Sequence, residues 1–159
     1  MQILRVLSLA GLAAIPIPQH LSGPDVVAVR RVVDGNTIDV GNYGRVRLAG
    51  VHAPRLGRRG LDSEPFADEA RRRLEGLVGS RFVRLEFPST TRTSAYVLLD
   101  DGTCVNAALA AAGLARVAGR PAGTRGEELL RAQARAQGER LGIWGARDNS
   151  ATPQVPTPK

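Results

Sequence analysis

Cysteine and aromatic residues are scarce in this sequence. The chain of 159 residues contains one cysteine, Cys104, which excludes an intramolecular disulfide framework and a metal site made only of cysteines. Aromatic residues make up 4% of the chain, and we expect most of them in the core. This scarcity argues against a protein that binds single strands mainly by stacking bases on aromatic rings.

Long apolar runs are also missing. The longest stretch, from Val6 to Ile17, is too short to anchor the chain across a bilayer. Because an arginine precedes it, residues 1–24 have the form of an export signal, which predicts a secreted or periplasmic protein; the alternative is an N-terminal arm on a cytoplasmic protein. Residues 146–159 are rich in Pro, Thr and Ser, and we predict that this tail is disordered.

Acidic residues are outnumbered by basic ones. The chain has 22 Lys and Arg against 15 Asp and Glu, which gives a net charge of +7. Nearly all of the cations are arginines, whose planar guanidinium suits phosphate oxygens. A nucleic acid or another polyanion is therefore one expected partner, and an arginine-rich solvated surface is the other interpretation. The length and a hydrophobic content of 43% fit one compact domain.

The hydrophobic patterns predict a small barrel with helices. Five segments are β-branched or alternate between apolar and polar residues: 25–35, 36–40, 45–51, 81–87 and 94–103. Three segments have helical periodicity: 64–80, 105–117 and 126–145. In the third helix we expect Leu130, Ala134 and Leu141 to face the core, with Gly138 in the helix interior. This order fits the α+β class, as a five-stranded OB-fold-like barrel flanked by three helices.

Several motifs follow one another in a characteristic order. They are VVDGNTIDV, RVRLAGVHAP, EPFADEA, YVLLDDGTCVNAALAAAGLARV and GIWG. This order resembles the staphylococcal-nuclease-like, or thermonuclease, family over residues 25–145. The resemblance implies phosphodiesters as substrates. It also implies a calcium ion held by two aspartates and a backbone carbonyl, a glutamate that activates or orients water, and two arginines that grip the phosphate.

The family's acidic positions are substituted in this chain. The resemblance places the first aspartate on Asn36, the second on His52, the carbonyl on Ala53 and the glutamate on Arg55. The two arginines are retained as Arg47 and Arg92. The family's aspartate at the position of Asp34 is also retained. The resemblance implies at most a supporting role for it, without direct contact to the metal.

The substituted residues have the wrong chemistry for calcium-dependent hydrolysis. Calcium requires oxygen ligands, whereas Asn36 offers one neutral oxygen and His52 offers nitrogen. Arg55 stays protonated and cannot accept a proton from water. We therefore predict that no calcium or other metal cofactor is bound and that hydrolysis is lost. An anion site would remain, formed by Arg47, Arg55, Arg92 and His52 at one mouth of the barrel.

Structural roles can also explain these residues. Asn36 can complete the turn that Asp-Gly-Asn favours, and His52 can be a half-buried residue bonded to the backbone. Arg47 can be a solvated residue on the outer face of a strand.

Two other functions stay open at the level of the sequence. The first is an active nuclease whose metal site is rebuilt from Asp34, Asp62 or Glu64. The second is a protein-interaction scaffold whose partner surface lies elsewhere. Metal dependence of cleavage separates the first from the rest, and the salt dependence of binding separates an anion site from a scaffold.

Overall fold

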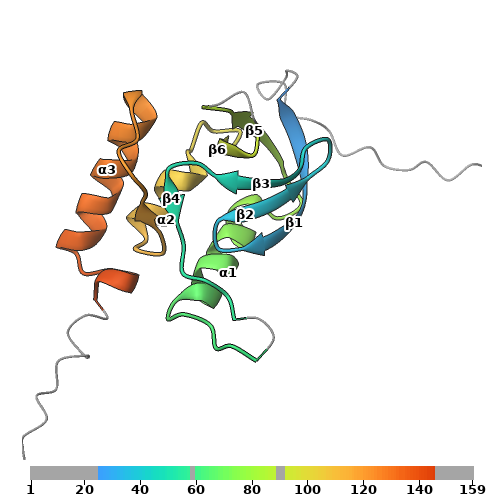
Figure 1. Ribbon diagram of the computed structural model, residues 1–159. Coiled ribbons are helices and arrows are strands. Elements are labelled where there is room, and N and C mark those ends of the chain that lie inside the picture. The colour runs from blue at the N-terminus through green and yellow to red at the C-terminus, as the bar shows by residue number, and fades with distance from the viewer. Residues whose placement is uncertain (1–24, 58–59, 89–91, 146–159) are drawn as a thin grey trace, which may run out of the picture.

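The computed structural model describes residues 25–57, 60–88 and 92–145 (Figure 1). The predicted export signal, residues 1–24, and the predicted tail, residues 146–159, lie outside the described residues, and both stay predictions. The strands are β1 (Val26–Asp34), β2 (Thr37–Val40), β3 (Gly44–Leu48), β4 (Val51–His52), β5 (Phe82–Glu86), β6 (Ser94–Leu98) and β7 (Arg116–Val117). The helices are α1 (Ala67–Val78), α2 (Val105–Ala111), α3 (Gly123–Gly138) and the 3₁₀ helix η2 (Gly142–Trp144).

Five of the strands close into a barrel in the order β1-β2-β3-β6-β5. The pair β3–β6 is parallel, and the other pairs are antiparallel, including β1–β5, which closes the barrel. α1 packs against β1, while α2 lies between the barrel and α3 (Figure 1). The predicted five-stranded barrel with three helices is confirmed.

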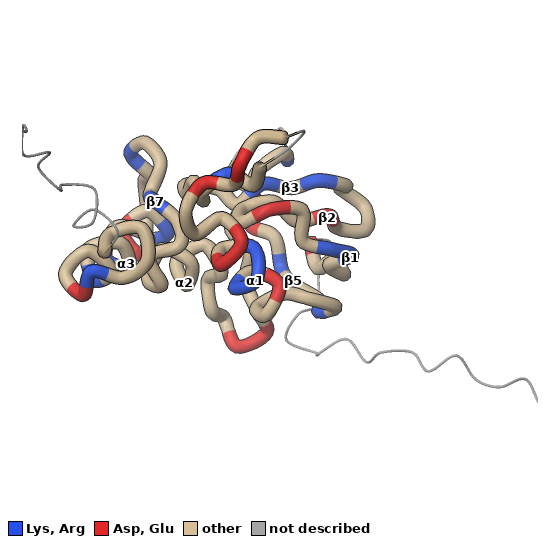
Figure 2. The backbone as a smooth tube through the Cα atoms, turned by 90° about the horizontal axis from the view of Figure 1, so that it is seen from below, with Lys and Arg blue, Asp and Glu red and all other residues tan. Residues whose placement is uncertain are grey.

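The barrel core follows from the alternation of side chains along the strands. On β3, Val46 and Leu48 are buried, whereas Arg45 and Arg47 are exposed. Basic residues lie on several strands, including β1, β3, β5 and β7 (Figure 2). Because apolar side chains fill the barrel, the arginines are left on its outer surface, where they can meet an anion.

A second, two-stranded sheet was not predicted. β4 and β7 form this small sheet, where the sequence suggested one continuous strand over 45–51 and one continuous helix over 105–117. α2 ends at Ala111 because Gly113 adopts a left-handed φ of 67°, which terminates helices readily. The residues after Gly113 are therefore free to pair with β4.

The predicted core stripe of the third helix is wrong. α3 buries Gly126, Leu129 and Ala136, while Leu130 is 47% exposed and Ala134 is exposed. Because leucines stand at both 129 and 130, the helical periodicity allows a buried face that contains either one. The pattern therefore does not fix the rotation of the helix. Two further points differ: Leu141 lies after α3, and Gly138 is its last residue rather than an interior one.

An ion pair between α3 and the barrel accompanies the observed rotation of the helix. The Nε atom of Arg125 lies 2.9 Å from a carboxylate oxygen of Glu86 on β5. Its Nη1 atom lies 2.9 Å from a carboxylate oxygen of Glu128, on the same helix. This doubly paired guanidinium has a raised pKa because both carboxylates stabilise its charge. The pairing joins α3 to β5 on the side of the helix that also buries Leu129 and Ala136.

Asn106 joins α2 to the barrel. Its side chain is fully buried, and its Nδ2 donates to the carbonyl oxygens of Ala49 and Ala95 at 2.8 and 3.2 Å. Its Oδ1 accepts a hydrogen bond from the Val97 N–H at 2.9 Å. One amide therefore ties α2 to β6 and to the turn between β3 and β4.

The described residues contain no helix that is both long and apolar enough to span a membrane.

Candidate functional site

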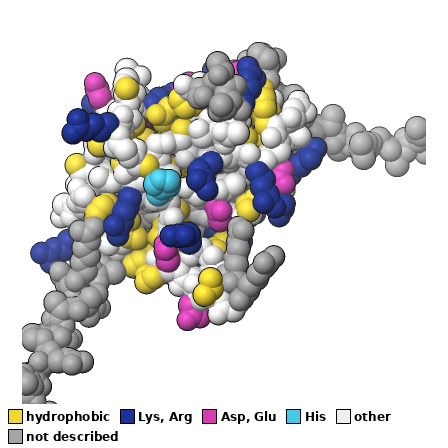
Figure 3. Space-filling view, in the orientation of Figure 1, with side chains coloured by type: hydrophobic (Ala, Val, Ile, Leu, Met, Phe, Trp, Pro, Cys, Tyr) yellow, Lys and Arg dark blue, Asp and Glu magenta, His cyan; other side chains and the backbone are white. Residues whose placement is uncertain are grey.

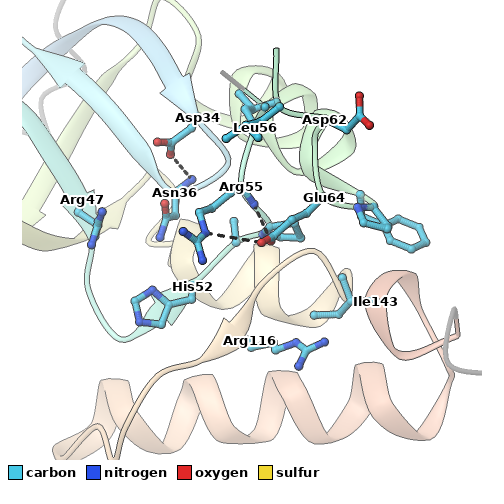
Figure 4. Close-up of a pocket in the computed structure, with 16 residues that line it drawn as sticks. Asp34, Asn36, Arg47, His52, Arg55, Leu56, Asp62, Glu64, Arg116 and Ile143 are labelled. Carbon is cyan, nitrogen blue, oxygen red and sulfur yellow. Dashed lines mark hydrogen bonds and ion pairs between the residues drawn. The ribbon is translucent and has the colours of Figure 1, made fainter. Parts of the chain in front are cut away.

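One face of the molecule carries the histidine side chain with basic side chains around it and acidic ones nearby (Figure 3). A cavity of about 1210 Å³ opens on this face, which exceeds the roughly 300–1,000 Å³ of a typical ligand pocket. Its walls come from the β1–β2 turn, β3, β4 with the loop after it, the start of α1, β7 and η2 (Figure 4). The lining includes most of the predicted site residues: Asp34, Asn36, Arg47, His52, Ala53, Arg55, Asp62 and Glu64.

Asn36 has a structural role that an aspartate could not fill. Its Nδ2 donates to the carbonyl oxygen of Val51 at 3.2 Å, and the side chain is buried. The expected turn is present, but Asp34 closes it, because the Asp34 carboxylate accepts the N–H of Asn36 at 3.0 Å. The amide of Asn36 therefore ties the β1–β2 turn to β4, and its only remaining side-chain acceptor is one neutral oxygen.

Gly35 lets this turn approach its neighbours closely. A Cβ atom at this position would lie 2.8 Å from the Cβ atoms of both Ala53 and Ala70. The turn that carries Asp34 and Asn36 is thus packed against the exit of β4 and against α1.

We expect Gly35→Ala to lower the free energy of unfolding by about 1–3 kcal/mol, because two backbone segments would have to move apart. Urea unfolding measures the change. Gly41→Ala is the matched control, since a Cβ there meets nothing within 4 Å, and its effect should stay within about 0.5 kcal/mol. Equal effects of the two substitutions would mean that the turn is not tightly packed.

His52 and Arg116 face each other on the small sheet. They are directly opposite in the β4–β7 register, and both are exposed, so the half-buried role considered for His52 is wrong. The guanidinium carbon of Arg116 lies 5.3 Å from the ring centroid of Trp144 in η2. This stacking positions the Arg116 cation at the cavity wall.

Sequence analysis missed Arg116, because we expected residues 105–117 to be one helix. The available signal was Gly113, which stands between the alanine-rich segment and the sequence LARV. A helix that ends at this glycine frees Arg116 to lie on a strand.

Arg55 and Glu64, at the two ends of the loop that follows β4, are joined by hydrogen bonds and an ion pair. The Glu64 carboxylate accepts the backbone N–H of Arg55 at 2.9 Å and lies 3.5 Å from the Nε atom of the same residue (Figure 4). In addition, the backbone N–H of Glu64 donates to the Arg55 carbonyl oxygen at 2.9 Å. The Arg55 side chain is nevertheless 89% exposed. Glu64 is therefore engaged with Arg55, while part of the guanidinium still faces solvent.

Arg47 is the cation at the cavity with the fewest competing contacts. It points outward from β3, in register with Thr37 on β2. No ion pair joins it to another residue in the part of the chain that the structure describes. Its five N–H donors are consequently available to an anion.

The structure does not bring Arg92 to the cavity. Its Nη1 lies 3.1 Å from the Asp25 carboxylate and 2.7 Å from the Tyr43 hydroxyl, and its guanidinium carbon lies 5.1 Å from the ring centroid of Phe87. The hydroxyl of Tyr43 donates to Asp25 at 2.8 Å, which raises the pKa of the tyrosine. The predicted convergence therefore holds for Arg47, His52 and Arg55, but not for Arg92.

The residues present do not fit a calcium ion. Residues 36, 52 and 55, where the resemblance implies acidic groups, offer a neutral amide oxygen, an imidazole and a guanidinium, and the last would repel a cation. Asp34 and Glu64 already accept backbone N–H groups. Throughout the described ranges, no group of three or more His, Cys, Asp or Glu side chains is placed to hold a metal ion.

The family was identified by comparison with known proteins. The model of the family described as staphylococcal nuclease homologue matches residues 45–146, which is more than half of the chain. The chain belongs to the staphylococcal nuclease family. The matched range includes the cavity residues from Arg47 to Ile143 and leaves the β1–β2 turn outside.

One curated relative of this chain has a nuclease name. The SPbeta prophage-derived endonuclease YokF of Bacillus subtilis (strain 168) is 33% identical over 129 residues. The alignment covers 74% of this chain and 43% of the relative. This staphylococcal nuclease homologue therefore spans less than half the length of that endonuclease.

Proposed function

We propose that this domain binds the phosphate groups of nucleic acid at the cavity and has lost the calcium-dependent hydrolysis of its family. One observation carries the proposal: Arg47, His52, Arg55 and Arg116 line a single cavity in which the family's acidic positions hold no carboxylate. The lining also contains Asp34, Asp62 and Glu64, of which Asp34 and Glu64 already accept backbone N–H groups. Arg47 and Arg116 are therefore the groups that offer their charge to an anion.

Charge-assisted hydrogen bonds would supply the affinity. A guanidinium that meets a phosphate oxygen contributes about 1.5–3 kcal/mol. Arg47 is free of ion pairs with other described residues, and Arg116 is held by Trp144. These two arginines are the principal phosphate ligands of the proposed site, and the exposed part of Arg55 adds charge at its rim.

Hydrolysis lacks a group that could activate water. Arg55, at the position of the family's glutamate, is protonated at any ordinary pH and cannot act as a base. Glu64, the nearest alternative, accepts the backbone N–H of Arg55 and pairs with its guanidinium. Its carboxylate is therefore already engaged with Arg55.

We expect the double variant Arg47→Ala, Arg116→Ala to bind a fluorescein-labelled single-stranded decamer about a hundredfold more weakly than the unmodified chain, because two charge-assisted contacts are lost. The slope of log K against log salt should fall by about 1.4, since each phosphate contact on a single strand contributes about 0.7. Fluorescence anisotropy over a range of salt concentrations measures both quantities.

The matched control removes two arginines that lie outside the cavity, Arg72 on α1 and Arg131 on α3. Their side chains are 64% and 72% exposed. The Arg72→Ala, Arg131→Ala variant carries the same change in net charge. If both double variants lose affinity equally, binding depends on net charge alone and the cavity is not the site.

An active metal-dependent nuclease is the second candidate function, and the endonuclease name of the relative in Bacillus subtilis favours it. Cleavage of the same labelled strand with calcium, magnesium, manganese or a chelator separates the two. The proposed function predicts no cleavage under any of these conditions. Cleavage that requires a metal and is lost in Arg47→Ala would overturn the proposed loss of hydrolysis.

A further inference from the structure

The cavity lining contains apolar as well as cationic side chains. Leu56, Phe66 and Ile143 belong to the same lining as the arginines. Ile143 is carried by η2, the element whose Trp144 stacks on Arg116, and Figure 4 shows Ile143 next to Arg116. An apolar side chain thus directly adjoins one cation of the proposed anion site.

Phe66 has an unusual place in the chain. Its backbone is left-handed, with φ 69° and ψ 7°, at the N-cap of α1. A bulky residue adopts this conformation at a cost, which persists where the surroundings impose it and which concentrates at functional sites. The Phe66 side chain makes no capping hydrogen bond, so helix capping does not explain the choice of residue.

Core packing does not explain Phe66 either. Its side chain is partly exposed and lies outside the cluster of residues that pack the barrel. The segment itself is well fixed, because the Phe66 carbonyl accepts the N–H of Ala70 at 2.9 Å and the Glu64 carbonyl accepts the N–H of Ala67 at 3.0 Å. A rigid backbone therefore holds an aromatic ring at the cavity.

We propose that Phe66 is a stacking platform for a nucleobase in the cavity that also holds the phosphate-binding arginines, with Ile143 as the apolar neighbour of Arg116. This inference rests on the proposed function and specifies it, because it makes the ligand a base-bearing nucleotide unit rather than any phosphate. A nucleotide unit combines a flat apolar base with a neighbouring phosphate, and stacking on an aromatic ring tolerates every base.

The chemistry of the cavity separates this ligand from other anions. Inorganic phosphate and polyphosphate would use the arginines and leave the Phe66 ring exposed to water. A single-stranded nucleic acid covers both parts of the lining at once. The domain should therefore prefer a strand with bases to a strand of equal charge without them.

The experiment compares two tetranucleotides that carry equal charge. One contains 2-aminopurine, and the other has abasic tetrahydrofuran units in place of every base. We expect the unmodified full chain to bind the base-containing strand about tenfold more tightly, within the usual range for one base stacked on an aromatic ring. Binding should also quench the fluorescence of the 2-aminopurine, which reports stacking without any substitution in the protein.

Phe66→Asn is the informative variant, because asparagine adopts a left-handed backbone more readily than phenylalanine does. We expect its melting temperature to be no lower than that of the unmodified chain, its preference for the base-containing strand to disappear, and its affinity for the abasic strand to stay unchanged. Leu130→Asn, on the exposed face of α3, is the control and should keep the preference.

The outcomes distinguish the nucleobase subsite from the anion site. Equal binding of both strands by the unmodified chain, without quenching, would overturn the nucleobase subsite and leave the anion site in place. A preference that survives in Phe66→Asn would overturn the role of Phe66. If neither strand binds, the proposed function itself fails and the subsite fails with it.

Discussion

The triple variant Asn36→Asp, His52→Asp, Arg55→Glu is expected to bind calcium and to cleave single-stranded DNA at least a hundredfold faster than the unmodified chain, since a positioned base alone contributes about 10²–10⁴-fold. The three positions line one cavity together with Arg47. The substitutions place three carboxylates there, and calcium affinity rises with the number of carboxylate ligands.

Stability measurements provide a second readout for this variant. Asn36→Asp removes the donor to the Val51 carbonyl, and Arg55→Glu places a carboxylate beside Glu64, so the variant without calcium should melt at a lower temperature than the unmodified chain. Saturating calcium should raise its melting temperature, because a ligand at a hundred times its Kd stabilises by about 2.7 kcal/mol. The melting temperature of the unmodified chain should not respond to calcium.

The control adds Arg47→Ala to the triple variant, which should retain calcium binding and lose most of the cleavage. If calcium neither stabilises the triple variant nor supports cleavage, the cavity has changed in shape as well as in charge. Metal-dependent cleavage by the unmodified chain would show instead that the proposed loss of hydrolysis is wrong.

Asn106→Ala is expected to lower the free energy of unfolding by about 2–6 kcal/mol. The side chain is fully buried and bonds to three backbone groups. Its removal leaves the N–H of Val97 and the carbonyl of Ala49 without this partner inside the protein, and each orphaned group costs about 1–3 kcal/mol. Urea unfolding followed by circular dichroism measures the loss.

Asn106→Asp is the matched comparison, because it keeps the acceptor for Val97 and removes the two donors. Its effect also includes the cost of a buried charge close to two carbonyl oxygens. We therefore expect both variants to be strongly destabilised. A loss below about 1 kcal/mol in Asn106→Ala would mean that water replaces the amide and that α2 is held by apolar packing.

The sequence was sufficient to predict the barrel, because its strands carry a clear alternation. The outward direction of Arg47 follows from that alternation. That residues 36, 52 and 55 carry no carboxylate can be read directly from the chain. Local patterns did not locate Arg116, because β4 and β7 have two residues each and no periodicity.

Other features depend on contacts between distant residues. The direction of the Arg92 side chain is set by Asp25, 67 positions earlier in the chain, and by two aromatic rings. The role of Glu64 depends on how the loop returns to Arg55, nine positions away. Neither contact leaves a signal in the spacing of residue types, which is why sequence analysis placed Arg92 at the cavity and considered Glu64 as a substitute ligand.

The order in which the cavity is assembled has a kinetic consequence. Its lining runs from Asp34 to Ile143, and the barrel closes only when β1 pairs with β5, for example Val27 with Val83. Hairpins between neighbouring strands can form within microseconds, whereas such distant pairings are slow. Binding at the cavity should consequently be the last property to appear during refolding, after the native circular dichroism signal has largely returned. A chain still emerging from the ribosome would be unable to bind until residue 143 had left the exit tunnel.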